Sequence, residues 1–239
     1  MNTDLQIMQE HLKFFTALDQ NKTQRLYNYL AFVLEANQQI NLTSITNWED
    51  AVIKHLFDSL TISKLAWWTD YSLILDLGSG AGFPGIPLAI TYPEKNFHVL
   101  EASKKKVEFL KTVKHHLNLE NLLILNERAE TLAHQPDYRE QYELVLARAV
   151  AELPVILELA IPFCQNGGIF VAFKGPHYSL ELERAERAIR LFGVKLEQSC
   201  HYHLPLEMGA RTLLAFKKIK KTPEKYPRRA GIPAKRPVL

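Results

Sequence analysis

The sequence has little cysteine and lacks an apolar run long enough to cross a membrane. Cys164 and Cys200 are the only cysteines among 239 residues, which argues against a disulfide framework or a thiolate metal site and fits the reducing cytoplasm. The best apolar stretch, 153–164, is interrupted by Glu158 and is shorter than the roughly 18 residues of a membrane span. The first residues carry no basic and apolar segments in succession, so we expect no secretory signal and no membrane contact.

The chain also has little net charge, but that charge is unevenly distributed. The formal total is +3, whereas residues 217–239 alone hold nine basic side chains and one acidic side chain. The body that precedes them is therefore mildly acidic. A basic tail that contains tyrosine and prolines predicts an RNA-binding arm that orders on contact, although a solubilising terminus is the alternative. We expect its RNA contacts to include Arg228, Arg229, Lys235 and Arg236.

From Tyr71 onward, short apolar runs alternate with amphipathic stretches. This pattern predicts a doubly wound, mostly parallel α/β sheet that helices cover on both faces. The expected strands are 73–77, 97–100, 122–125, 144–147 and 169–173, and the expected helices lie near 84–92, 103–117, 152–165 and 178–192. Segments 194–202 and 212–216 then follow one another without a helix, which predicts an antiparallel last strand.

The first 70 residues predict a helical region in front of the sheet. Apolar residues recur at helical spacing over 5–15 and 26–33. Thr46 and Glu49 have the spacing of a capping box, which predicts the start of a third helix that ends near residue 63. We therefore expect a helical region at 1–70, a sheet domain at 71–216 and a basic tail at 217–239.

Glycine is scarce, which makes one cluster of it informative. Four of the ten glycines follow the first predicted strand, at Gly78, Gly80, Gly82 and Gly85. Glycines let the backbone turn tightly and approach a ligand, and doubly wound sheets bind ligands at the carboxyl ends of their strands. We therefore predict a ligand site here. A dinucleotide fingerprint would require a third glycine where Phe83 stands, so a nicotinamide dehydrogenase is a weak alternative.

Residues at the next two strand ends predict contacts to a nucleoside. Glu101 ends the second strand, where a carboxylate can accept hydrogen bonds from ribose hydroxyls. Ala102 and Ser103 follow it, and Ser103 is expected to cap the next helix. Ala129 and Glu130 lie just beyond the third strand, where we expect the adenine edge, with an ordinary surface loop as the alternative.

Four charged or polar residues complete the candidate site. Arg148 ends the fourth strand within an apolar run and must find a partner, either the cofactor, an acidic neighbour or an RNA phosphate. Lys174 ends the fifth strand, where we expect it to meet an RNA phosphate. His55 and Asp58 lie one turn apart and share a helix face. A role in RNA binding is one interpretation of this pair, and a helix-surface pair is the other.

The G-x-G-x-G spacing resembles the first motif of class I S-adenosylmethionine-dependent methyltransferases. The residues after the fourth strand lack an Asp/Asn-Pro-Pro-aromatic motif, and the chain has no Pro-Cys pair, which argues against exocyclic amines and pyrimidine C5 as targets. Methylation of guanine N7 requires neither motif, because N7 attacks with a free lone pair. Transfer can then depend on the alignment of N7 with the methyl group on the sulfonium. We therefore expect that no catalytic residue is required and that Arg148 and Lys174 are positioning candidates. We also expect no metal, because His201 and His203 have no third ligand.

Six motifs together resemble the bacterial 16S rRNA (guanine-N7) methyltransferase family, often called glucose-inhibited division protein B. They are Asn41–Thr43, His55–Leu60, Asp76–Gly85, Ala147–Ala151, Phe173–Gly175 and Tyr226–Pro233. The resemblance implies methyl transfer from S-adenosylmethionine to a guanosine in a conserved loop of 16S rRNA, either naked or in a small-subunit particle. It also implies cofactor contacts at Gly78, Phe83, Glu101, Ala102, Ser103, Ala129, Glu130 and Arg148. We expect a monomer.

Two other function classes stay open at this point. A small-molecule methyltransferase would explain the glycine loop but would leave the basic tail unused. A non-catalytic RNA-binding module would keep the fold without the cofactor. The lysines at 104–106 begin a predicted helix, where the helix dipole disfavours cations. Both a solvated face and a phosphate contact remain possible for them.

Overall fold

The computed structural model describes residues 3–239. Within them, the strands are β1 (Leu73–Leu77), β2 (Asn96–Leu100), β3 (Leu122–Leu125), β4 (Tyr142–Arg148), β5 (Cys164–Lys174), β6 (Val194–His203) and β7 (Ala210–Lys218). They form one sheet in the order β3-β2-β1-β4-β5-β7-β6. The first five strands are parallel, and β7 runs antiparallel to both β5 and β6. The predicted mostly parallel sheet with an antiparallel end is confirmed.

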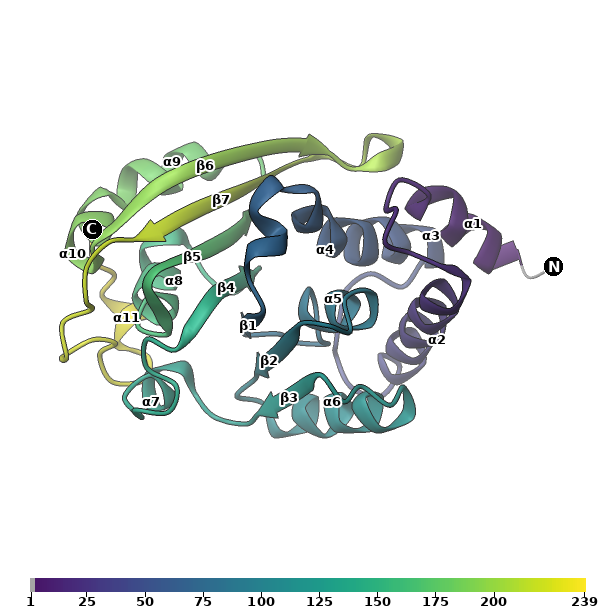
Figure 1. The fold of residues 1–239 in the computed structure, drawn as a ribbon, viewed down its shortest axis with the longest axis horizontal. Helices are drawn as coiled ribbons and strands as arrows, with labels where there is room; N and C mark the ends of the chain where they lie inside the picture. Colours follow the sequence, from purple (N-terminus) through teal and green to yellow (C-terminus); the bar gives the residue numbers. More distant parts are fainter. Residues whose placement is uncertain (1–2) are drawn as a thin grey trace.

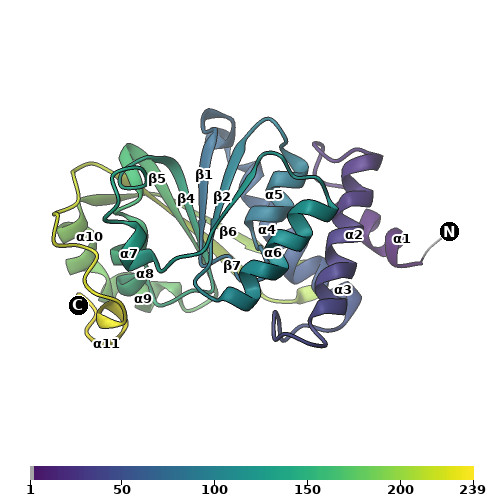
Figure 2. The ribbon, with the colours of Figure 1, turned by 90° about the horizontal axis from the view of Figure 1, so that it is seen from below.

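Helices cover both faces of this sheet (Figures 1 and 2). One face carries α1 (Thr3–Leu12), α2 (Gln20–Ala36), α3 (Trp48–Ala51), α4 (Asp58–Leu60), α5 (Gly85–Thr91) and α6 (Lys104–His116). The other face carries α7 (Ala129–Leu132), α8 (Leu153–Ala160), α9 (Tyr178–Arg184), α10 (Glu186–Phe192) and α11 (Ile232–Lys235). The helix predicted near 178–192 is thus two helices that meet at Ala185. None of the helices in residues 3–239 has both the length and the apolar character of a membrane span.

The N-terminal helices share one apolar core with the sheet. Met8 of α1 and Leu26 of α2 are fully buried in the same cluster as Ile74 of β1. Helix α2 also reaches the glycine loop, because the Tyr29 hydroxyl donates a hydrogen bond to the Ala81 carbonyl at 2.9 Å. The helical region therefore helps to fix the loop that follows β1.

The third helix begins one residue later than predicted. Asn47 caps α3, and its side chain accepts a hydrogen bond from the Asp50 amide at 3.0 Å. The prediction of Thr46 was wrong because asparagine caps a helix at least as well as threonine does, and here the Asn47 side chain makes the capping bond. In the first turn of this helix, Glu49 Oε1 lies 2.7 Å from His11 Nε2. A π-helical turn, Val52–Phe57, then leads into α4, and such turns often occur at functional sites.

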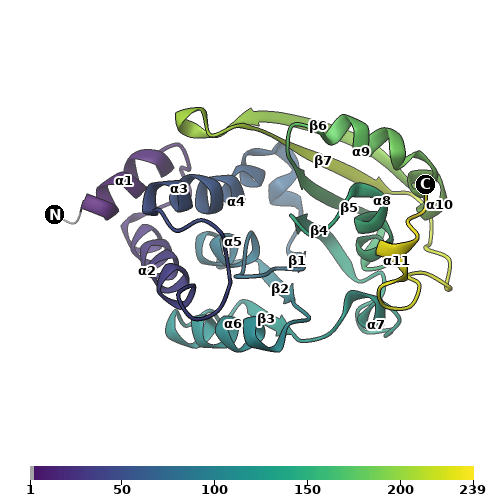
Figure 3. The ribbon, with the colours of Figure 1, turned by 180° about the vertical axis from the view of Figure 1, so that it is seen from behind.

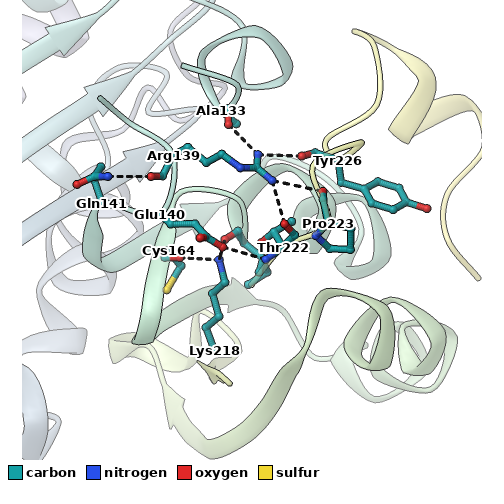
Figure 4. Close-up of polar contacts among 10 residues, drawn as sticks. Ala133, Arg139, Glu140, Gln141, Cys164, Lys218, Thr222, Pro223 and Tyr226 are labelled. Carbon is teal, nitrogen blue, oxygen red and sulfur yellow. Dashed lines mark hydrogen bonds and ion pairs between the residues drawn. The ribbon is translucent and has the colours of Figure 1, made fainter. Parts of the chain in front are cut away.

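The basic tail is folded onto the body of the protein (Figure 3). The Arg139 guanidinium donates hydrogen bonds to the carbonyl oxygens of Thr222, Pro223 and Tyr226 (Figure 4). Val238, near the end of the chain, is buried in the core under α8 and α10. The expectation of an arm that orders only on contact is therefore wrong. Prolines restrict regular structure in the tail after β7 to the single turn of α11, but they leave carbonyl oxygens that an arginine can bind.

Lys218 anchors the start of the tail (Figure 4). Its side chain is fully buried, and Nζ donates to Glu140 Oε1 at 2.6 Å and to the carbonyls of Ile161 and Cys164. These contacts use all three donors of the ammonium group. Glu140 Oε1 also accepts from the Thr222 amide at 2.9 Å. One carboxylate thus joins the last strand to the first turn of the tail.

Candidate active site

A cavity of about 210 Å³ opens at the carboxyl ends of β1 and β2. Its polar lining includes Glu101 and Glu130, and its apolar walls come from Leu77, Leu100 and Leu159. Of the residues predicted to bind the cofactor, the structure brings Gly78, Glu101, Ala102, Ala129 and Glu130 together here. Residues from three strand ends thus meet as the sequence predicted.

Glu101 ties the glycine loop to the end of β2. Its carboxylate is nine-tenths buried and accepts hydrogen bonds from the Gly80 amide at 3.0 Å and the Ser103 amide at 2.8 Å. Ser103 occupies the N-cap position of α6 as predicted, but within residues 3–239 its side chain makes no capping bond. Its backbone amide binds Glu101 instead. The result is a fixed carboxylate at the rim of the cavity.

The glycine loop is open on one side and tightly packed on the other. Gly80 has a φ of +62°, and a Cβ added there would meet no atom of residues 3–239 within 4 Å. Gly82 has a φ of +107°, a conformation that L side chains rarely adopt, and a Cβ there would lie 2.4 Å from Ile86 Cδ1 of α5, so the position strongly favours glycine. The loop is also held by Asp76, which accepts a hydrogen bond from the Gly85 amide at 2.8 Å and whose pKa burial raises to about 6.

Phe83 is part of this loop and follows Gly82. Its ring stacks on the His55 ring, with the two ring centroids 4.4 Å apart, and packs at 5.3 Å against Tyr29. The Arg148 guanidinium lies 5.1 Å from the centroid of the same phenylalanine ring. Phe83 is thus a packing residue in this structure, and its predicted cofactor contact stays a prediction.

A second cavity of about 630 Å³ lies at the carboxyl ends of β4 and β5. Val150 lines both cavities, so they are neighbours. The charged and histidine residues of its lining are Lys54, His55, Asp58, Arg148, Glu152, Lys174, Glu181 and Arg211. Arg148, predicted as a cofactor contact, therefore lines the larger cavity, together with His55, Asp58 and Lys174.

Arg148 finds its partner in the N-terminal region. Its Nη1 donates to Asp58 Oδ2 at 3.0 Å and to the Lys54 carbonyl at 3.1 Å, and its Nη2 faces His55 Nδ1 at 3.4 Å. Of the three partners considered for this arginine, the acidic neighbour is the one present. The Tyr202 hydroxyl donates to the other oxygen of Asp58 at 2.7 Å. Two of the five N–H groups of Arg148 have no partner within residues 3–239.

His55 is held as a neutral imidazole. Because arginine only donates, the Nδ1 that faces Arg148 must accept, and the proton therefore resides on Nε2. That Nε2 lies 2.8 Å from the Thr43 hydroxyl oxygen, which can accept its hydrogen. Burial and the nearby charges of Arg148 and Lys54 lower the pKa of His55 to about 3. The ring is thus fixed at both nitrogens and cannot take up a proton near neutral pH.

Lys174 is paired within the protein. Its Nζ lies 2.6 Å from Glu181 Oε2 and donates to the Ala151 carbonyl at 2.8 Å. The same Glu181 oxygen accepts from the Leu153 amide at 2.7 Å. Lys174 therefore braces the wall of the larger cavity, and its contact with RNA phosphate stays a prediction.

The reasoning from sequence missed Tyr202 and Arg211. They lie opposite each other on β6 and β7, and both approach Asp58, with Arg211 Nε at 4.0 Å from Oδ1. No motif marks either residue. The one available signal is that Tyr202 ends, and Arg211 directly precedes, the two segments predicted to close the sheet as an antiparallel pair.

The comparisons with known proteins agree with this geometry. A family model, GidB, described as rRNA small subunit methyltransferase G, matches residues 22–208. The chain belongs to the GidB family. The Ribosomal RNA small subunit methyltransferase G of Carboxydothermus hydrogenoformans is 40% identical, over 95% of this chain and 96% of that one. The protein of that name from Pelotomaculum thermopropionicum is 41% identical, over 92% of each chain.

A solved structure supports the fold alone. The O-methyltransferase from Bacillus cereus in complex with SAH has a TM-score of 0.58 to this chain. Its sequence identity is 16%, and the match covers 89% of this chain and 97% of that one. The GidB sheet is thus of the class I methyltransferase type, and the family predicted from the motifs is confirmed.

The pKa of His55 predicts a pH dependence of stability. The folded-state pKa of about 3 lies below the ordinary value of 6.5, so the unfolded chain binds the extra proton between these values. Stability therefore rises with pH across this window and is lost as the pH falls through it, by about 1.4 kcal/mol per pH unit. The raised pKa of Asp76 makes its own contribution to stability fall as the pH rises. Asp76 is present in both proteins compared below, so its contribution cancels from their difference.

Urea unfolding of the unaltered protein and of His55→Gln checks this expectation. Between about pH 4 and pH 6, we expect the free energy of unfolding to rise less steeply with pH in the variant than in the unaltered protein. The difference between the two slopes is expected to be about 1 kcal/mol per pH unit or more. His203→Gln alters an exposed histidine and serves as the matched control, with an unchanged slope. Equal slopes for His55→Gln and the unaltered protein would show that His55 is not held neutral.

Proposed function

We propose that this protein transfers a methyl group from S-adenosylmethionine to N7 of a guanosine in the 16S rRNA of the small ribosomal subunit. Membership of the GidB family supports the rRNA substrate. The observation that carries the proposal is the pair of neighbouring cavities that share Val150. One has the features of a nucleoside site, and the other has the size and polar groups to hold a purine.

The residues of the smaller cavity fit the cofactor. Glu101 offers a fixed carboxylate to two ribose hydroxyls, and Leu100 and Leu159 offer apolar walls to an adenine ring. The open side of Gly80 leaves room for a methionine moiety next to the loop. When bound, S-adenosylmethionine supplies an activated methyl group on a positively charged sulfur.

The larger cavity offers partners for the polar edges of guanine. Arg148 has two N–H groups without a protein partner among residues 3–239, and arginine donors suit the O6 acceptor of guanine. Carboxylates of Glu152 and Glu181 also line the cavity and can accept hydrogen bonds from the N1 and N2 groups of the base. The apolar ring of Phe173 supplies a further wall. These groups support a role in orienting the base.

Transfer to N7 suits a site without a general base. The lone pair of N7 forms the new bond as the carbon–sulfur bond breaks, and the positive charge passes to the guanine ring. No proton must leave first. The neutral and doubly held His55 is a poor base near neutral pH, which agrees with this requirement. We infer that Arg148 and Lys174 act by positioning and by excluding water.

The docked tail supports a role in RNA binding for its exposed cations. Arg229, Lys235 and Arg236 are exposed, so they are available to phosphates. Arg228 differs from them, because its guanidinium pairs with the buried Glu158 at 2.6 Å. We infer that Arg228 mainly anchors the tail.

We also infer that the protein acts in the cytoplasm as a monomer, on naked rRNA or a small-subunit particle.

A methyl-transfer assay tests the proposed activity. Purified protein, radiolabelled S-adenosylmethionine and small subunits from a strain that lacks this gene are expected to yield labelled 16S rRNA. Reduction followed by strand cleavage, a reaction specific for N7-methylguanosine, should map the label to a single guanosine. Glu101→Gln is expected to lower the activity about tenfold or more, because it loses a charged acceptor. Label at another atom, or no label in rRNA, would contradict the proposal.

The tail makes a separate prediction about salt. The triple variant Arg229→Ser, Lys235→Ser, Arg236→Ser is expected to bind RNA with a shallower slope of log affinity against log salt, by about 0.7–0.9 for each phosphate that the tail no longer neutralises. The matched control replaces Lys13, Lys22 and Lys111 with serine, which removes the same charge from the opposite side of the sheet. A filter-binding titration measures both. If both variants give the slope of the unaltered protein, the tail has no part in RNA binding.

A further inference from the structure

Helix α7 forms one wall of the smaller cavity. Ala129 and Glu130 of this helix line the cavity, and Leu159 of α8 lines it as well. Helix α7 is a single turn of four residues, and a turn of this length is not stable by itself. Among residues 3–239, its cap position, Arg128, contributes no side-chain hydrogen bond. The position of this wall therefore depends on contacts from elsewhere.

The docked tail supplies those contacts from the outer side of α7. The Gly231 amide donates to Glu130 Oε1 at 3.0 Å. The His134 Nε2 donates to the Pro227 carbonyl at 2.8 Å, since a carbonyl oxygen can only accept. Two hydrogen bonds thus join the tail to the short segment 130–134.

The tail also holds α8 next to the same cavity. Glu158, the neighbour of Leu159, is fully buried, and its carboxylate accepts from Arg228 Nε at 2.8 Å, from Nη2 at 2.6 Å and from the Arg228 amide at 2.9 Å. The packing of Tyr226 against Phe192 of α10, with the two ring centroids 5.2 Å apart, adds an apolar contact. The tail is therefore fixed independently of α7 and can serve as its support.

We propose that the docked part of the tail, residues 222–238, positions α7 and thereby sets the affinity of the cofactor site. His134 and Arg228 are the positioning residues: His134 joins the segment after α7 to the tail, and Arg228 joins the tail to α8 through Glu158. The inference rests on the proposed function, because it takes S-adenosylmethionine as the ligand of the smaller cavity. It gives the tail a second role besides contact with RNA.

His134 allows a clean test, because it contacts the tail and is not among the residues that line the cavity. Calorimetry of the full-length protein with S-adenosylhomocysteine compares His134→Ala with His134→Gln. Removal of the hydrogen bond to Pro227 is expected to weaken binding about three- to tenfold in the alanine variant. The glutamine variant retains a donor and is expected to recover part of that affinity. The matched control is His203→Ala at an exposed histidine, which should bind as the unaltered protein does.

A second variant removes the support at α8 without leaving a buried charge. Glu158→Leu combined with Arg228→Leu replaces the ion pair by apolar side chains, which proteins often tolerate. It is also expected to weaken S-adenosylhomocysteine binding several-fold, while urea unfolding confirms that the chain is folded.

The outcomes separate the two proposals. Normal binding by the folded alanine and double-leucine variants would overturn the role of the tail alone. Equal weakening of S-adenosylhomocysteine binding in His134→Ala and in the control His203→Ala would also overturn it, because the effect would then not depend on the contact with the tail. Failure of the unaltered protein to bind S-adenosylhomocysteine would contradict the proposed function, and the inference with it.

Discussion

The ion pair between Arg148 and Asp58 joins the parts of the chain that form the candidate site. Arg148 ends β4, Asp58 begins α4, and their side chains are 12% and 5% exposed. Charges this deeply buried are tolerated only when they are paired and hydrogen-bonded. The Lys54 carbonyl accepts a second hydrogen bond from Arg148, and the Tyr202 hydroxyl donates to the other oxygen of Asp58. The N-terminal helices, the centre of the sheet and its antiparallel edge must therefore meet at this point.

The same contacts shape the boundary between the two cavities. Ala149 follows Arg148 with a φ of +56°, a conformation that costs a non-glycine residue on the order of 1 kcal/mol. The turn brings Val150 against the glycine loop, where its Cγ2 lies 2.7 Å from the position of a Cβ on Gly78. The fixed arginine on one side and the glycine on the other hold this turn in place. The two cavities thereby lie on either side of one valine.

Local patterns in the sequence predicted much of this arrangement. The alternation of strands and helices indicated the sheet, and the position of Glu101 after β2 indicated the carboxylate at the cavity, because strand ends in a parallel sheet share one edge. The partners of Arg148 were out of reach, since Asp58 and Tyr202 come from distant segments whose approach only the folded chain defines. The expectation that the tail orders only on contact failed for the same reason: its charge is visible in the sequence, but the buried Glu158 that binds Arg228 is not. The start of α3 depended on two adjacent residues that can both cap a helix, and the sequence pattern alone does not distinguish them.

A double-mutant cycle on Arg148 and Asp58 tests the central claim most directly. Urea unfolding would compare Arg148→Met, Asp58→Leu and the double variant with the unaltered protein. Each single change leaves one buried charge without its partner, so we expect a destabilisation of about 3–5 kcal/mol for each and a destabilisation of the double variant well below their sum. A coupling free energy close to zero, with the two effects simply additive, would show that the ion pair does not hold the site together.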